Sequence, residues 1–276
     1  MKILVPTDFS KLSNTASHYA TQMANKLNAE IVLIHVVHLN SPPRAQVALR
    51  VKEIEDKMAD NAKQDCIQLA NELKSKFNAP KVTYKIIKGY PVEDVIENYA
   101  VHNQVDFIVM GTKGASGLQK VLIGSNAAAV ISSSSIPVII VPEHARFNEI
   151  EKIVYASDVD KTETELNTLI KFAELFGAAI HLIHVLPPAS DKKIDIVKMK
   201  ADIKKKLKYP SISVQIILSD DILDGINECV ADQKADMIAM FTQKHSFFEK
   251  LFGMSITRQM AFHTWTPMLS IKKTHG

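Results

Sequence analysis

Short apolar runs alternate with longer amphipathic stretches along the first half of the chain. The short runs are rich in Val and Ile, and most are continuously apolar, as expected for strands that are covered on both faces. They span residues 3–6, 31–37, 82–88, 107–110 and 138–141. Between them, apolar residues recur every three or four positions, which is typical of helices with one buried face. Such helices are indicated by Leu12, Ala16, Tyr19, Met23 and Leu27, by a longer set from Val47 to Leu73, and by Val92, Val95, Ile96 and Tyr99.

The second half of the chain repeats this pattern. Lys2-Ile-Leu returns as Lys152-Ile-Val, and Asp8 returns as Asp158. The runs at 31–37, 105–110 and 136–139 return at 180–186, 235–240 and 266–269. A period of this size indicates two whole domains rather than a solenoid of small repeats. We expect domains at 1–143 and 150–276, joined by the polar segment 142–149.

Strict alternation of strands and helices predicts an α/β fold with a parallel sheet and right-handed crossovers in each domain. Five strands fit two tandem doubly wound domains, flavodoxin-like or Rossmann-like, each with the strand order 3-2-1-4-5. Such a sheet binds ligands beyond the carboxyl ends of its strands, where the order reverses. In the first domain this point lies between the loops that follow Val5 and Met110.

The loop after Met110 holds four of the nine glycines in the chain, Gly111, Gly114, Gly117 and Gly124. Glycine permits left-handed backbone angles and close approach of the backbone to a ligand. A helical pattern resumes at Ser125, and the free amides at a helix N-terminus favour phosphates. Lys113 and Lys120 could add positive charge at the same mouth. A simpler alternative is that the glycines serve only turns.

The glycine spacing is specific. The chain has no G-x-x-x-x-G-K-[ST] loop and no G-x-G-x-x-G after the first strand, so the two commonest phosphate motifs are absent. What is present is G-x2-G-x9-G-[ST], at Gly111, Gly114, Gly124 and Ser125. Together with Pro-Thr-Asp at 6–8, Ile-His-Val at 34–36 and Gly-Tyr-Pro at 89–91, this spacing resembles the nucleotide-binding signature of the universal stress proteins, and the resemblance covers the chain twice.

The resemblance implies an ATP site in the first domain. Asp8, with its neighbours Pro6 and Thr7, would lie on the adenosine side. Backbone groups of Val36 would face the adenine, and Met110 and Gly111 would approach the ribose. The phosphates would be held by Gly114, Gly124, Ser125 and Asn126, with Mg²⁺ or Mn²⁺ bridging them. Asp8 could instead be only a helix N-cap, and His35 and His184 are expected to end strands rather than bind metal.

The second copy departs from the signature. Phe241, Lys244, Met254 and Ser255 stand where the first copy has Gly111, Gly114, Gly124 and Ser125. The Phe241 ring would occupy space that the ribose needs, so we expect that this domain does not bind ATP. The aromatic segment 245–252 either fills the vacated pocket or forms a patch for a partner.

Composition excludes several other classes. The formal net charge of +3 is too small to indicate a nucleic-acid partner, and the lysines at 204–206 and 208 are expected to form a solvated helix face, a phosphate-binding patch being the alternative. No segment reaches the apolar length of a membrane span, and the N-terminus does not resemble a signal peptide, so we expect a cytoplasmic protein. Cys66 and Cys229 are expected to be buried small hydrophobes in a reducing compartment.

Three functions fit these features. The leading hypothesis is an ATP-binding regulatory protein of the stress response, since no catalytic base, arginine finger or P-loop lysine is visible. Slow ATP hydrolysis through Asp8, Ser125 and a bound metal is the second. A protein-interaction module with a vestigial nucleotide site is the third. The fifth strand, followed by Pro142, lies at a sheet edge, so we also expect pairing between the two domains of one chain, and a homodimer is compatible with the sequence.

Overall fold

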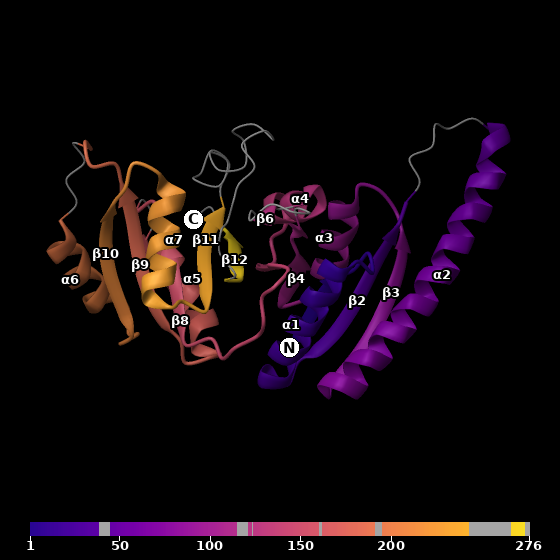
Figure 1. Cartoon of the computed structure of the whole chain (residues 1–276), viewed down its shortest axis with the longest axis horizontal. Helices are drawn as coiled ribbons and strands as arrows, with labels where there is room; N and C mark the ends of the chain where they lie inside the picture. Colours follow the sequence, from indigo (N-terminus) through magenta and orange to yellow (C-terminus); the bar gives the residue numbers. More distant parts are fainter. Residues whose placement is uncertain are drawn as a thin grey trace. The chain divides into compact units, whose positions relative to one another are not determined.

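The computed structural model describes residues 1–38, 45–114, 121–122, 124–159, 162–190, 195–242 and 266–273. The chain divides into two compact units whose main boundary lies between Phe147 and Asn148, in the polar segment 142–149, and the described residues Val121 and Leu122 are grouped with the second unit. Each unit is an α/β domain built on a parallel sheet (Figure 1).

The first unit follows the predicted alternation of strands and helices. The elements up to Phe147, in chain order, are β1 (Lys2–Pro6), α1 (Lys11–Leu27), β2 (Glu30–Val37), α2 (Ala45–Phe77), β3 (Lys81–Lys88), α3 (Val92–His102), β4 (Phe107–Gly111), the two-residue strands β5 (Lys113–Gly114) and β6 (Val121–Leu122), α4 (Ser125–Ser133) and β7 (Val138–Val141). All of them except β6 belong to the first unit. The five long strands begin and end within one residue of the apolar runs, because burial on both faces makes such strands continuously apolar.

The described part of the second unit repeats the order of the long strands and of the first three helices. Its elements are β8 (Lys152–Ala156), α5 (Thr162–Glu174), β9 (Ala179–Leu186), α6 (Ile196–Lys206), β10 (Ile212–Leu218), α7 (Ile222–Gln233), β11 (Met237–Thr242) and β12 (Met268–Lys272). Residues 243–265, which correspond in the repeat to the glycine loop and α4, lie outside the described part of the chain.

The strand order confirms the predicted topology in both units. The first unit has the order β3-β2-β1-β4-β7 and the second has β10-β9-β8-β11-β12, with every pair parallel. Ile3 of β1 lies opposite Ile31 on one side and Phe107 on the other. Ile153 of β8 has the equivalent position between Ile180 and Met237. The order therefore reverses beside β1 in the first unit and beside β8 in the second.

Helices cover both faces of the first sheet, which places the core between layers. α1 and α2 pack together on one face, and α3 packs with α4 on the other. Cys66 of α2 and Cys229 of α7 are buried, and burial raises the pKa of their thiols to about 12 and about 11. Both therefore behave as buried apolar groups, as predicted. In the part of the chain that the structure describes, no helix has the length and apolar character needed to cross a bilayer.

Candidate functional site

A cavity of about 540 Å³ lies at the carboxyl ends of β1, β2 and β4 in the first unit, where the strand order reverses. Side chains of α2 and α3 and the first residues of α4 complete its wall. Nine of the ten residues predicted to bind the nucleotide line it: Pro6, Thr7, Asp8, Val36, Met110, Gly111, Gly124, Ser125 and Asn126. Gly114 lies in β5 and is not among the described residues that line the cavity.

The loop after β1 is held by its own hydroxyl and carboxylate groups. Phe9 has a left-handed backbone, with φ of 62°, and its amide donates to Thr7 Oγ1 at 3.0 Å. The Ser10 amide donates to Asp8 Oδ1 at 3.0 Å. The N-cap of α1 is Ser10, whose side chain accepts from the amide of Ser13 at 3.3 Å. Asp8 therefore shapes the turn before the helix, and the alternative that Asp8 is the N-cap is wrong.

Asp8 is ionised at neutral pH in this setting. Burial by itself raises the pKa of the Asp8 carboxyl, but hydrogen bonds from the side chain and backbone of Ser10 and from Ser13 outweigh burial, and the pKa is lowered. The residue remains exposed at the edge of the cavity. It offers a carboxylate that can accept hydrogen bonds from hydroxyl or amine groups of a ligand.

His35 is oriented by the same loop. Its Nδ1 lies 2.7 Å from the carbonyl oxygen of Thr7, and its ring stacks on Phe9 at 4.9 Å between centroids. A carbonyl only accepts hydrogen bonds, so the ring proton is on Nδ1. No group of three or more His, Cys, Asp or Glu side chains among the described residues could hold a metal ion. His35 lies within β2, two residues before its end, and its ring contacts the loop that follows β1.

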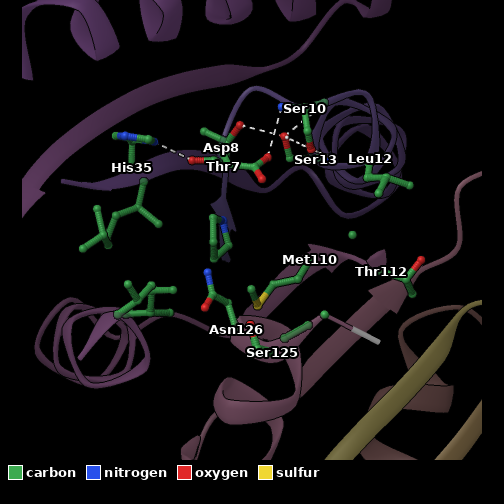
Figure 2. A pocket seen from close by; sticks show the side chains of 18 of the residues that line it. Thr7, Asp8, Ser10, Leu12, Ser13, His35, Met110, Thr112, Ser125 and Asn126 are labelled. Carbon is green, nitrogen blue, oxygen red and sulfur yellow. Dashed lines mark hydrogen bonds between the residues drawn. The ribbon is translucent and has the colours of Figure 1, made fainter. Parts of the chain in front are cut away.

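The opposite side of the cavity is the N-terminus of α4. Figure 2 shows Thr7 and Asp8 across the cavity from Met110, Ser125 and Asn126. Gly124 is the N-cap, without a side-chain hydrogen bond, and the first amide bonded back to its carbonyl is that of Ala128, at 2.9 Å. The amides of Ser125, Asn126 and Ala127 come before this bond and have no carbonyl within the helix to bond. This end of the helix can therefore bind an anion.

The structure corrects the reasons given for two of the glycines. Gly124 has φ of −65° and ψ of 155°, an extended conformation that any residue adopts, so no left-handed angle is needed there. At Gly111, an added Cβ would lie 2.7 Å from the carbonyl oxygen of Leu12 and 2.9 Å from its carbon. Gly111 is therefore required by the close approach of β4 to the start of α1, whether or not a ligand is bound.

The lining also includes residues that the sequence did not predict as part of the site, among them Ser10, Ser13, Met58, Val92 and Ile96. Met58 lies on α2 and is more than a third exposed. Met58 belongs to the regular apolar pattern of its helix, which predicts a residue packed in the core. Only the folded structure shows that it lines the cavity.

The equivalent crevice of the second unit is smaller and differently charged. The cavity there measures about 90 Å³ and is lined by Ala156, Ser157, Asp158, Ile183, His184, Val185, Ile222 and Ile226. The Lys273 ammonium pairs with Asp158 at 2.8 Å and with Glu165 at 2.7 Å. Glu165 also accepts a hydrogen bond from the hydroxyl of Tyr155. The carboxylate that corresponds to Asp8 is therefore already paired with a cation of the chain itself.

Phe241 does not act as the sequence suggested. Its ring lies edge-on to Tyr155, with centroids 5.5 Å apart, and it is buried rather than among the described residues that line the cavity. The Phe241 ring packs on the face of the sheet where Tyr155 bonds Glu165 of α5. On the corresponding face of the first unit, Gly111 has no side chain and α1 packs close to the strand. The expectations for Lys244, Met254, Ser255 and the aromatic segment 245–252 fall outside the described residues.

Comparison with known proteins matches both halves of the chain to one family. The model of the universal stress protein family matches residues 1–142 and 149–272. A universal stress protein of Methanocaldococcus jannaschii is 31% identical over 140 residues, which cover 51% of this chain and 81% of that protein. A second from the same organism is 27% identical over 154 residues, covering 51% and 93%.

A solved structure shows the same fold over the whole chain. The crystal structure of a universal stress protein from Archaeoglobus fulgidus matches with a TM-score of 0.75 at 22% identity, covering 99% of this chain and 98% of that one. Two matches to one family model, on two domains of the same topology, agree with the repeat in the sequence. The chain therefore belongs to the universal stress protein family, as a tandem member with two copies of the family domain.

Proposed function

We propose that the first unit binds ATP and that the protein acts as a nucleotide-binding regulator in the stress response, with a second unit that does not hold the nucleotide. The observation that carries the proposal is the 540 Å³ cavity of the first unit, which has an anion-binding helix end on one side and an ionised carboxylate on the other. Its volume lies within the usual range for small-molecule sites.

The helix end would take the phosphates. Ser125 and Asn126 are exposed at the start of α4, and three amides there have no partner within the helix. The positive end of the helix dipole adds to their attraction for an anion. Gly114, whose backbone continues from β4 into β5, would complete the phosphate side as the family resemblance implies.

The nucleoside would lie along the apolar wall. Val36, Met58, Val92 and Ile96 come together there from β2, α2 and α3. A flat purine can bury its faces against such side chains, with backbone groups of Val36 facing its edge. The Asp8 carboxylate accepts hydrogen bonds from ribose hydroxyls in this arrangement, and its lowered pKa keeps it ionised across the neutral range.

The site could hold Mg²⁺ or Mn²⁺ only together with the phosphates of the nucleotide, which would supply most of the ligand oxygens. Asp8 is the one acidic residue among the described residues that line the cavity, so the protein side offers a single carboxylate. Mg²⁺ usually keeps several waters and is held by one or two carboxylates together with substrate phosphates. When bound, the ion would neutralise phosphate charge, while the amides of α4 orient the chain of phosphates.

Binding rather than turnover is the function that the lining favours. The described residues that line the cavity include no Lys, Arg or Glu, and Asp8 is engaged by the Ser10 amide. Phosphoryl transfer relies on positioned cations and on a group that orients the attacking water. Partners would instead respond to the nucleotide-bound state, which requires that the nucleotide bind one conformation of the protein more tightly than another. Pairing of the two domains and a homodimer remain expectations.

The test compares Gly124→Asp with Gly124→Asn in the full chain. Both residues suit the extended N-cap backbone, so α4 is retained in both, but only Asp places a negative charge at the phosphate side. We expect calorimetric titration with ATP and Mg²⁺ to give an affinity about 100-fold lower for Asp than for Asn.

Equal affinities of the two variants, or no ATP binding by the wild type, would contradict the proposal. Phosphate release is measured on the same samples. Turnover well above the uncatalysed rate, abolished in Gly124→Asp, would favour the hydrolase alternative.

A further inference from the structure

The long helix of the first unit extends past the sheet that it covers. α2 has 33 residues, which corresponds to roughly 50 Å at the usual helical rise. The eight-residue strands β2 and β3 that it covers each span only about 26 Å. Because α2 connects the carboxyl end of β2 to the amino end of β3, its N-terminal half lies beyond the carboxyl ends of the strands, at the edge where the cavity opens (Figure 1).

The packing of α2 changes at Ala62. The C-terminal half of the helix packs on α1 and on the sheet, and its buried side chains are Ala62, Cys66, Leu69, Ala70 and Leu73. None of the side chains from Val51 to Asn61 is buried, and the largest apolar ones, Ile54 and Met58, are 49% and 37% exposed. Of the α2 side chains that the structure describes, only Met58 lines the cavity. The N-terminal half of α2 therefore adds little to the core, but it supplies part of the cavity wall.

A surface ion pair joins this half of the helix to the sheet. Lys88, the last residue of β3, pairs with Asp56 of α2. The hydrogen bond from Lys88 lowers the pKa of the Asp56 carboxyl, so the carboxyl stays ionised at neutral pH. Asp56 lies two residues before Met58, so the pair holds the helical turn that carries Met58. Neither Asp56 nor Lys88 is among the described residues that line the cavity.

The described part of the second unit has no counterpart of this arrangement. Its corresponding helix, α6, has 11 residues. The strand registers pair Val37 with Lys88 in the first unit and Leu186 with Leu218 in the second, so an exposed leucine stands in place of Lys88. The cavity at the same edge measures about 90 Å³ instead of about 540 Å³. The long helix and the ion pair thus occur in the unit that has the large cavity.

We propose that Met58, positioned by the Asp56–Lys88 pair, makes the first cavity selective for a purine base over a pyrimidine base. This inference rests on the function proposed for the first unit, and it concerns the base end of the nucleotide rather than the phosphate end. A flexible thioether side chain adapts to an aromatic ring and makes favourable sulfur contacts with it. The two fused rings of a purine offer Met58 more area than the single ring of a pyrimidine, and apolar stabilisation grows with the area that is covered.

The test titrates ATP, UTP and inorganic tripolyphosphate, each with Mg²⁺, into the full chain in a calorimeter. Met58→Ala is expected to lower the affinity for ATP about tenfold and that for UTP about threefold, because part of a methionine contact is lost. Tripolyphosphate has no base, so its affinity should not change, and its binding also shows that the variant is folded. The matched control is Ile54→Ala, one turn earlier on the same helix, which lines no part of the cavity and should leave all three affinities unchanged.

Two substitutions of Asp56 test the positioning role. Asp56→Asn removes the charge that Lys88 binds and is expected to lower the affinity for ATP about threefold, the range of an exposed ion pair. Asp56→Glu keeps the charge and should retain the affinity of the wild type. Tripolyphosphate should bind equally to both variants, which distinguishes a change in the base contact from a general loss of structure.

Several results would overturn the inference. They are an unchanged ratio of ATP to UTP affinity in Met58→Ala, an equal loss for all three ligands, the same loss in Ile54→Ala, or full ATP affinity in Asp56→Asn. A wild type that binds ATP while Met58→Ala binds it equally well would refute this inference and leave the proposed function intact. A wild type that binds neither ATP nor tripolyphosphate would refute the proposed function, and this inference with it.

Discussion

The two crevices have the same topology and the same aspartate after the first strand, yet they place their lysines differently. In the first unit, Lys11 is exposed and pairs with Glu143 at 3.0 Å on the surface, and Asp8 is bonded by its own loop. In the second, Lys273 stands at the position that corresponds in the repeat to Glu143. Its side chain is 6% exposed and pairs inward with Asp158 and Glu165. The residue at this position beyond the fifth strand thus pairs at the surface in the first unit and with the aspartate in the second.

The largest effect is expected from removing the inward lysine. Lys273→Met removes the cation that pairs with the buried Glu165 and the partly buried Asp158, and breaking such a buried pair typically costs about 3–5 kcal/mol of unfolding free energy. Hydrogen exchange followed by mass spectrometry should show faster exchange in β8 and α5, with β1 and α1 unchanged. Unchanged protection in the second unit would show that the ion pairs contribute little net stability.

Substitutions at the end of the fourth strand of each unit are expected to give the next largest losses of stability. Phe241→Ala removes a buried ring from beside Tyr155 and should lower the free energy of unfolding by about 3 kcal/mol.

Gly111→Ala forces a Cβ against the backbone of Leu12 and should lower the free energy of unfolding by about 2 kcal/mol. Denaturant titration of Phe241→Ala and of Gly111→Ala measures the loss of unfolding free energy in each variant. A Gly111→Ala protein as stable as wild type would mean that α1 can move away without cost.

Alkaline pH should destabilise the second unit selectively. Burial lowers the pKa of Lys273, but hydrogen bonds and charges of Asp158 and Glu165 outweigh it and raise the pKa above 10.5. Burial and Glu165 raise the pKa of Tyr155 well above 10.0. Both groups hold their protons more tightly when folded, so their contribution is complete below about pH 10 and is lost as pH rises through the folded values.

Hydrogen exchange of the two units, recorded from pH 8 to 11 and corrected for the intrinsic rate, checks this expectation. Protection of β8 and α5 should fall before that of β1 and α1. Lys273→Met should reduce the difference in pH-dependent protection between the two units. An equal decline of protection in both units of the wild type would contradict the expectation of selective destabilisation.

The smallest effect is expected at the surface pair of the first unit. Lys11 is 79% exposed, and such pairs contribute between zero and about 1 kcal/mol. Lys11→Met should therefore leave the denaturation midpoint almost unchanged. A loss of unfolding free energy as large as that of Lys273→Met would contradict the contrast between the exposed Lys11 and the buried Lys273.

The sequence by itself determined the repeat, the order of strands and helices, and the edge of the sheet where a ligand can bind. Hydrophobic periodicity is local, and a parallel sheet with short right-handed crossovers has few alternative topologies. The G-x2-G-x9-G-[ST] spacing also pointed to the loop whose last residues line the first cavity.

Only the tertiary structure decided how these residues are used. Gly111 is needed because of the backbone of Leu12, Met58 reaches the cavity from a distant helix, and Lys273 meets a carboxylate 115 residues earlier in the chain. Nothing in the sequence shows that the outer ring nitrogen of His184 is buried without a hydrogen-bond partner among the described residues. Each of these facts depends on a distance between residues far apart in sequence, which periodicity and spacing along the chain do not encode.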